Sequence, residues 1–270
     1  MAELAASVSA YRRLVGGRIR ADWQYRTAFV VFMLGQALAM TADLGAVGLV
    51  FANVDALAGW TGTEVVFLFA TSGVSFALAD MLVSPVEKVA GHLKAGTFDT
   101  FLVRPVGALW QLCGTEFELR RIGRLLQPVV VLAIAVRLLD VDWTPARVLL
   151  VAVSLVSGAC IFGGIWVLTS SIAFWTVETQ EIANSFTYGG SQLTSYPIDV
   201  LGAWLRRLAV FVVPLASVSY LPACALLAKP MPFDLPRGAA WTGPAVALLV
   251  CLLARAVWRE AIRHHRSTGS

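Results

Sequence analysis

Charge is scarce in this 270-residue sequence, and the scarcity decides the class of protein. Charged residues make up 14% of the chain, against about a quarter in an average soluble domain, whereas hydrophobic residues make up 58%. A water-soluble surface cannot be built from so few charged side chains. The composition therefore indicates an integral membrane protein whose main solvent is lipid.

The residue patterns of common enzyme sites are also missing. Lys88, Lys94 and Lys229 lie in no glycine-rich phosphate-binding motif, so the chain is not expected to hydrolyse ATP by that route. Neither a GxSxG nor an HExxH motif occurs, which makes an intramembrane enzyme the weaker interpretation. The four cysteines form no CxxC pair, so we interpret them as packing residues. We expect no catalytic residue, no bound cofactor and no metal site in this chain.

Long apolar stretches predict an all-α, polytopic fold with about six membrane crossings, since roughly 20 apolar residues span a ~30 Å hydrocarbon core. Most of these crossings are conventional, but the fifth in order is interrupted by glycines and prolines. The pattern there favours one spanning helix plus a broken or re-entrant segment. The expected spans are 27–51, 64–83, 125–139, 148–175, 182–228 (with the re-entrant region) and 241–258, within a membrane domain of residues 27–259.

Positive charge collects in residues 1–26, in the 84–124 loop and in the 260–270 tail, whereas the 53–63 loop carries no Lys or Arg. Short cytosolic loops hold the Lys and Arg excess of membrane proteins, so we expect both termini and the 84–124 loop to be cytosolic. Charges interrupt the apolar residues of the first segment, so no cleaved signal peptide is expected. The expected location is the cytoplasmic membrane of a bacterium.

The segment from Glu87 to Pro105 combines an amphipathic helix with a stop at Gly96 and a restart at Arg104-Pro105. A short helix that is held at the membrane surface and bounded by rigid breaks at both ends can transmit force from a soluble partner. An ordinary interfacial loop is the alternative, and composition alone favours it.

The block GTFDTFLVRP at 96–105 resembles the cytosolic coupling segment of ABC-2 type transporter permeases. Similar blocks follow at 174–178, 196–197, 213–216 and 220–223. The resemblance is to the drug-exporter-like branch of that family and extends over nearly the whole chain. It implies a dimer of six-helix permeases, identical or related, and separate ABC ATPase subunits that carry ATP and Mg²⁺. It also implies that the ATPase docks on the loop after the second crossing and that transport is export by alternating access.

The resemblance also implies roles for particular residues. The implied ATPase-coupling surface consists of Glu87, Gly96, Phe98, Asp99, Arg104, Pro105 and Glu178. Residues 8–25 would form an amphipathic helix along the membrane, and the stretch from 196 to 222 would form an outer gate. The candidate pathway or gate residues are Gln36, Asp43, Asn184, Tyr188, Tyr196 and Pro197. For the polar residues within the spans, ordinary interhelical hydrogen bonds are an equally good interpretation.

Ionisable residues inside the spans need partners or water. We expect Asp80, near the cytosolic end of its helix, to pair with Lys88 or with an amino-terminal arginine. Asp43 either faces a cavity or lies near the outer interface. The Arg206-Arg207 pair is costly in hydrocarbon and leaves the ends of the fifth crossing open. Small residues between 154 and 163 allow close helix approach, and we expect packing within the chain rather than a dimer seam.

Together these patterns predict a permease subunit of an ATP-driven exporter of a hydrophobic or amphiphilic compound. Its expected partners are an ABC ATPase, a second permease and the lipid bilayer, and no nucleic acid is expected. A membrane-anchoring or structural subunit of another complex is the alternative. A self-sufficient secondary transporter is disfavoured, because internal repeats and paired broken helices would be expected, and only one half of this chain is broken.

Overall fold

A computed structural model describes residues 11, 13–20, 24, 26–103, 107–176, 180–213 and 215–265. This part of the chain is a bundle of helices, and its only β-type pairing is an isolated bridge between Leu57 and Trp60. The all-α membrane fold predicted from the sequence is confirmed.

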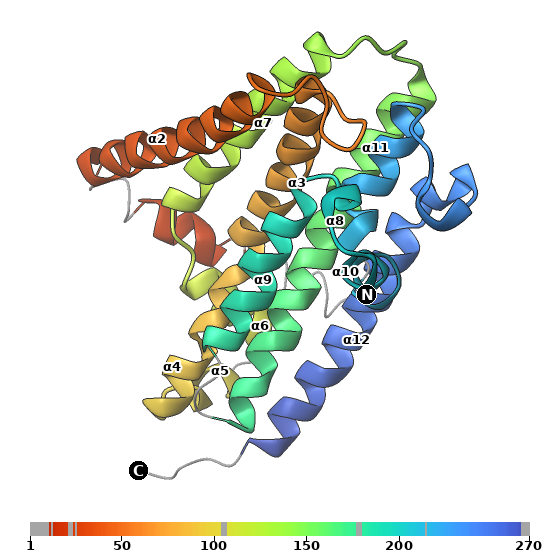
Figure 1. The fold of residues 1–270 in the computed structure, drawn as a ribbon. Helices are drawn as coiled ribbons and strands as arrows, with labels where there is room; N and C mark the ends of the chain where they lie inside the picture. Colours follow the sequence, from red (N-terminus) through yellow and green to blue (C-terminus); the bar gives the residue numbers. More distant parts are fainter. Residues whose placement is uncertain are drawn as a thin grey trace.

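Long helices form the body of the bundle, and short ones form its ends (Figure 1). The long helices are α2 (Arg26–Phe51), α3 (Gly62–Leu82), α7 (Arg120–Leu138), α8 (Pro145–Ser171), α9 (Gln180–Thr194) and α12 (Gly243–His264). The short helices of the first half are η2 (Ser84–Lys88), α4 (Val89–Lys94), α5 (Asp99–Leu102) and α6 (Ala108–Thr115). Those of the second half are η3 (Ile172–Phe174), η4 (Ile198–Val200), α10 (Ala203–Arg207), the π-helical η5 (Leu208–Val212), η6 (Leu215–Ser217), α11 (Tyr220–Leu226), η7 (Pro232–Asp234) and η8 (Arg237–Trp241).

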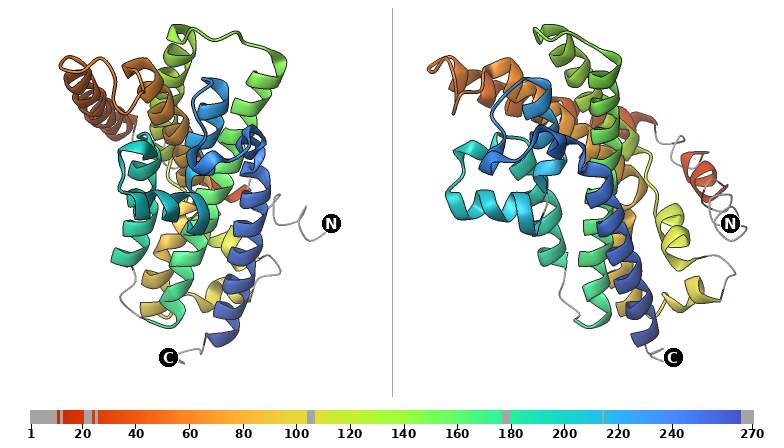
Figure 2. Two further views of the ribbon diagram at one scale, coloured as in Figure 1. Left: turned by 45° about the vertical axis from the view of Figure 1, so that its right-hand side comes forward. Right: turned by 90° about the vertical axis from the view of Figure 1, so that its right-hand side faces the viewer.

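The two ends of the bundle are named here by their place in Figure 1. The lower end holds α4, α5 and the carboxyl-terminal end of α12. The upper end holds the 52–61 and 139–144 loops together with α11. Helices α8 and α12 run side by side between the two ends in all three views (Figures 1 and 2).

Three helical stretches are long and apolar enough to cross a bilayer by themselves. They are Thr27–Phe51, Gly62–Leu82 and Pro145–Phe174, with mean hydropathies of 1.6, 1.9 and 2.4. Helices α7 and α12 are also long, but each carries several charged residues toward its lower end. The count of six crossings therefore stays a prediction.

Some helices differ from the expected boundaries. Helix α7 begins at Arg120 rather than at Leu125, because its first turns are held by ion pairs described below. Helix α12 continues to His264, beyond the expected end at 258. The 182–228 region consists of α9, α11 and four shorter helices between them, with Pro197 at the start of η4.

Helix α8 lies at the centre of the bundle because small residues let its neighbours approach. A Cβ atom on Gly158 would lie 2.7 Å from Ser75 Oγ of α3. A Cβ atom on Gly164 would lie 2.6 Å from Val250 Cγ1 of α12. The small residues of this helix thus pack against helices of the same chain, as such residues do in membrane bundles.

Helix α2 leans away from the rest of the bundle (Figure 1) and buries almost none of its side chains. It contacts α7 where Gln127 Nε2 donates to the carbonyl oxygen of Met33 at 3.3 Å. Its apolar side chains point outward, with Leu34 65% and Leu38 73% exposed. Lipid tails or a neighbouring protein helix would cover such a surface in a membrane.

The amino-terminal segment packs against the lower half of the bundle where the structure describes it. Residues 13–20 are helical. The Tyr11 ring lies edge-on to Trp110 of α6, with 5.9 Å between centroids, and Arg18 Nε donates to the carbonyl oxygen of Thr115 at 2.5 Å. Much of the surface helix expected at 8–25 lies outside the described residues, as do residues 266–270 of the tail.

Candidate functional site

A buried ion cluster joins α3 to α7 just before the chain enters η2. The Asp80 carboxylate is 1% exposed and accepts from Arg121 Nη1 at 2.5 Å and from Arg124 Nη1 at 3.2 Å. Ser84 Oγ also donates to Asp80 Oδ1 at 2.7 Å. A buried carboxylate needs such a full set of donors, because leaving one buried charge unpaired is strongly destabilising.

The prediction that Asp80 pairs with Lys88 or an amino-terminal arginine was wrong. Neither Lys88 nor an amino-terminal arginine of the described residues contacts it; α7 supplies both cations. The early start of α7 places Arg121 and Arg124 on one face of that helix, three residues apart, beside the end of α3. Lys88 instead pairs with residues that precede α7.

A second group of ion pairs ties η2 to the residues before α7. Lys88 Nζ lies 2.9 Å from Glu116 and 3.0 Å from Glu118, and Arg120 Nε lies 2.6 Å from Glu118. Burial alone raises the pKa of Glu118, but the hydrogen bonds from Arg120 and Lys88 outweigh it and lower that pKa to about 2. The start of the 84–124 loop is thereby fastened to the base of α7.

Glu87, expected on the coupling surface, lies between these two groups. Its side chain is 18% exposed and lies 3.8 Å from Arg121 Nη2. Burial raises the pKa of Glu87, and the positive charge of Arg121 opposes this shift only in part. In this structure Glu87 faces the ion cluster more than the surface.

Phe98, also expected on the coupling surface, is fully buried. Its ring lies edge-on to Phe174 of η3, which directly follows α8 (5.2 Å between centroids, 80°), and to His265 after α12 (5.4 Å, 84°). Trp258 of α12 closes the cluster, 6.5 Å from Phe98 and 5.6 Å from Phe174. Phe98 therefore anchors its segment to α8 and α12 rather than presenting a surface.

The turn around Phe98 is exposed on its other side. Gly96 has φ +65°, a left-handed conformation that glycine adopts without strain, and it reverses the chain between α4 and α5. The Asp99 side chain is 43% exposed and contacts His265 Nε2 through Oδ1 at 2.8 Å. Leu102 and Val103 are 39% and 83% exposed. We call residues 95–103 the docking turn. Arg104, Pro105 and Glu178 lie outside the described residues.

The candidate pathway residues are not brought together. On the leaning helix α2, Gln36 is half-buried and Asp43 is exposed. Tyr188 of α9 is 40% exposed and packs edge-on against Phe76, 5.4 Å away, and Trp166, 6.2 Å away. The Asn184 side chain lies outside the described part of the structure. The cavity at the upper end, described below, is lined by none of these residues.

Tyr196 and Pro197 lie instead in the apolar core of the upper half, where Pro197 is buried and Tyr196 half-buried. Asp199, two positions after Pro197, is the centre of a polar cluster that was not predicted from the sequence. Its Oδ2 atom accepts from Tyr220 Oη at 2.6 Å and from Trp60 Nε1 at 3.0 Å.

Arg206, one of the two arginines that looked costly in the sequence, lies 3.7 Å from the same Asp199 carboxylate. Its guanidinium also stacks over the Phe233 ring at 5.3 Å. Both carboxylate and guanidinium keep about a third of their surface exposed, so this arginine is neither unpaired nor deeply buried. Arg206 thus ties α10 to η4 at the surface of the upper half.

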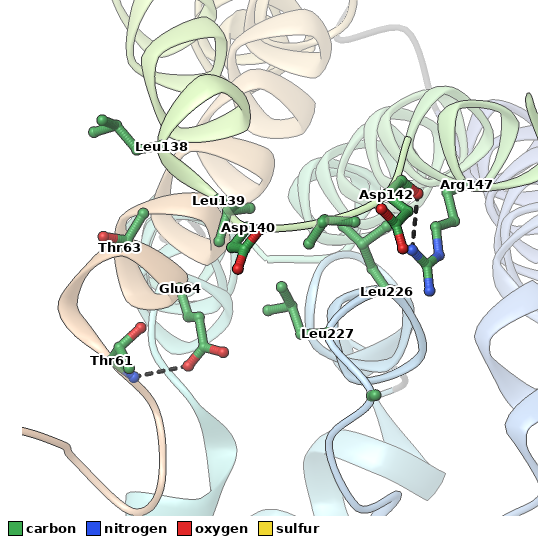
Figure 3. A pocket seen from close by; sticks show the side chains of 12 residues that line it. Thr61, Thr63, Glu64, Leu138, Leu139, Asp140, Asp142, Arg147, Leu226 and Leu227 are labelled. Carbon is green, nitrogen blue, oxygen red and sulfur yellow. Dashed lines mark hydrogen bonds between the residues drawn. The ribbon is translucent and has the colours of Figure 1, made fainter. Parts of the chain in front are cut away.

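A cavity of about 450 Å³ opens at the upper end between the start of α3, the 139–144 loop and the end of α11 (Figure 3). Glu64 and Asp140 point into it in Figure 3. Lys229 closes one edge, 2.8 Å from Glu64 and 2.7 Å from the carbonyl oxygen of Gly59. Among the residues described, no group of His, Cys, Asp and Glu side chains is arranged to hold a metal ion.

A family model described as "ABC-2 family transporter protein" matches residues 37–269. The chain belongs to the ABC-2 transporter family. The resemblance drawn from the sequence is thereby confirmed. No curated protein and no solved structure matches the chain. Family membership makes this chain a membrane-embedded permease component and implies that it works with an ABC ATPase subunit.

In this ABC-2 permease, the segment that carries the family resemblance is held by two separate sets of contacts. Its beginning is held by the contact of Glu87 with Arg121 of α7, which pairs with Asp80 of α3, and the docking turn is held by the aromatic cluster with Phe174, just after α8, and Trp258 of α12. Sequence reasoning missed Arg121, Trp258 and His265. Each of them contacts residues that are distant in the sequence; His265 and Asp99, for example, are 166 positions apart. No local sequence pattern predicts such contacts.

Proposed function

We propose that this permease subunit exports a hydrophobic or amphiphilic compound with energy from ATP hydrolysed by a separate ABC ATPase. The ATPase docks on the docking turn, residues 95–103. ATP and Mg²⁺ are held by the ATPase, and this chain binds no cofactor itself. A second permease, identical or related, completes the transporter.

One observation carries the docking proposal: the same short segment is exposed on one side and rigidly anchored on the other. Asp99 and Val103 are accessible, whereas Phe98, immediately before Asp99, is fully buried. A partner that pushes on the exposed side therefore moves the buried side with it, since packed interiors transmit displacement rather than absorb it.

The anchors determine where such a displacement goes. Phe98 contacts residues at the lower ends of α8 and α12, and both helices continue to the upper half of the bundle. Glu87, at the start of the same segment, lies 3.8 Å from Arg121 of α7, and Arg121 in turn pairs with Asp80 of α3. Movement of the docking turn would thus reach four long helices.

The proposal requires that the lower end of the bundle faces the cytosol. Positive residues of the 84–124 loop and of the end of α12 collect at this end, which follows the positive-inside rule. The exposed apolar Leu102 and Val103 would there be covered by the ATPase. The apolar face of α2 would be covered by lipid or by the second permease.

The docking proposal is tested by co-expression of the permease with its cognate ABC ATPase. Asp99→Lys reverses the charge of the docking turn without touching Phe98, and we expect it to lower ATPase co-purification and substrate-dependent ATP turnover roughly tenfold, which corresponds to ~1.4 kcal/mol. Asp142→Lys makes the same charge change at an exposed residue of the upper end and serves as the matched control. Equal behaviour of the two variants would refute the docking assignment.

The export proposal needs a separate measurement. Proteoliposomes that contain the permease and its ATPase are loaded with a panel of lipophilic compounds, and ATP-dependent movement of each compound is recorded. We expect at least one to move with ATP and none to move with a hydrolysis-deficient ATPase. If the wild-type chain retains no ATPase at all, the anchoring-subunit interpretation replaces the transporter.

A further inference from the structure

The carboxyl-terminal end of α12 makes a polar contact with the docking turn as well as an aromatic one. His265 Nε2 lies 2.8 Å from Asp99 Oδ1, and the imidazole is 14% exposed, against 43% for the Asp99 side chain. We propose that His265 is a positioning residue of the coupling site: it fixes the carboxylate of Asp99 and joins the docking turn to α12. The inference rests on the proposed docking of an ATPase at this turn.

The orientation of His265 is set by its surroundings. Its backbone N–H donates to the carbonyl oxygens of Ala261 and Ile262, at 3.1 and 3.2 Å, and so closes the last turn of α12. Its ring packs edge-on against Phe98, at 5.4 Å and 84°, and against Phe174, at 6.0 Å and 84°. Two perpendicular aromatic neighbours and a helix end leave the ring little freedom, and Nε2 consequently faces Asp99.

Asp99 itself has little local support. It begins α5, which has only four residues, and a helix that short is not stable by its own hydrogen bonds. The residues before it form a turn through the left-handed Gly96. The position of Asp99 therefore depends on tertiary contacts, among them the packing of the adjacent Phe98 on the buried side and the contact with His265 on the exposed side.

The neighbouring groups at this end of α12 have other contacts. The ring of His264 stacks against Trp175 at 5.8 Å, and Arg263 Nη1 lies 3.3 Å from Glu260 of its own helix. His265, in contrast, places its Nε2 atom against Asp99. A plain helix terminus would not need that contact, because the backbone of His265 already closes the helix.

Through this contact, α12 would move together with the docking turn. Helix α12 packs tightly along α8, where Gly164 leaves room for Val250. A displacement of Asp99 would therefore be passed through His265 to α12 and from there to α8. This route is separate from the ion cluster that leads to α3 and α7.

The test compares three His265 variants in proteoliposomes that contain the permease and its cognate ATPase. His265→Phe keeps a buried ring but has no polar atom, and His265→Gln keeps a donor at a similar reach. His265→Ala removes both. His264→Ala is the matched control on the adjacent residue. The measured quantity is the transport rate divided by the ATP hydrolysis rate, with the thermal unfolding midpoint recorded for each variant.

We expect His265→Phe to lower transport per ATP about fivefold, within the range for one lost hydrogen bond, with little change in unfolding midpoint. His265→Gln should recover at least half of the loss, and His264→Ala should match wild type. Wild-type coupling in His265→Phe, or no recovery in His265→Gln, would overturn the positioning role while leaving ATPase docking intact. A wild-type permease that does not bind the ATPase would overturn both proposals. If His265→Ala unfolds, the Phe and Gln variants still decide the question.

Discussion

The lower and upper ends of this bundle both rely on charged side chains, but they hold them very differently. At the lower end, Asp80 and Arg121 are 1% and 4% exposed and lie 2.5 Å apart. At the upper end, Asp199 and Arg206 are 27% and 33% exposed and lie 3.7 Å apart. Buried pairs are costly to break, whereas half-exposed pairs contribute little.

The backbone follows the same division. The docking turn at the lower end packs against the ends of two long helices, through Phe174 after α8 and Trp258 of α12, whereas the upper half between 198 and 226 consists of 3₁₀, π and short α segments. Regions with short elements and exposed contacts open at lower free energy than packed cores. We therefore expect the upper half between 198 and 226 to open at lower free energy than the anchored docking turn.

The largest effect is expected from unpairing the lower cluster. Arg121→Met leaves Asp80 buried without its closest cation and should reduce the free energy of unfolding by about 3–5 kcal/mol. Arg206→Met, the same change at the upper end, should cost less than about 1 kcal/mol. Denaturation of the purified protein in detergent measures both. A similar loss of unfolding free energy in the two variants would contradict the proposed difference between the two ends.

The aromatic anchor should come next. Phe98→Ala empties a fully buried site and should cost about 3 kcal/mol, because the ring's packing with Phe174 and Trp258 is lost. Phe233→Ala at the upper end removes a ring that is 37% exposed and should cost well under half of that. The two unfolding midpoints in the same detergent provide the check, and a larger shift for Phe233 would contradict the account.

A smaller effect is expected at Asp199. Asp199→Asn keeps the side-chain shape but weakens the acceptor for Tyr220 and Trp60, at a cost of about 1–2 kcal/mol. Hydrogen exchange should then speed up in residues 198–226 and stay unchanged in α4 and the docking turn. Faster exchange at both ends would mean that they unfold as a single unit.

The smallest effect is a pH dependence at the lower end. The pKa of Glu118 in the folded state is about 2, below its ordinary value of 4.5, so Glu118 stabilises the fold above pH 4.5 and loses this contribution as the pH falls toward 2. Because the Glu118 side chain is partly exposed and solvent screens its ion pairs, we expect less than about 1 kcal/mol. Unfolding of the wild type and of Glu118→Gln is compared between pH 6 and 2, and the difference should shrink below pH 4.5 and disappear toward pH 2.

The sequence was informative wherever the signal was local. Apolar length predicted α2, α3 and α8, and the small residues near Gly158 indicated the close packing of α8. The motif at 96–105 pointed to the family. These features depend on composition and short spacing, which a single chain shows directly.

The sequence was silent or misleading where distant residues meet. From the sequence, Phe98 was predicted to lie on the surface as part of a motif. In the structure its ring is surrounded by side chains at the ends of α8 and α12. Asp80 was given a partner nearby in sequence, but its partners are 41 and 44 positions away. Such pairings follow from how the helices pack, and hydrophobic periodicity carries no information about them.

The most direct test of the central claim is cross-linking from the docking turn. Thr100 is exposed there, and Thr100→Cys places a thiol beside Asp99 without disturbing Phe98. We predict that a short thiol–amine cross-linker joins this cysteine to the ABC ATPase in membranes, in a variant without the native cysteines, and that Asp142→Cys at the upper end gives no such product. Cross-linking from Asp142→Cys but not from Thr100→Cys would contradict the account.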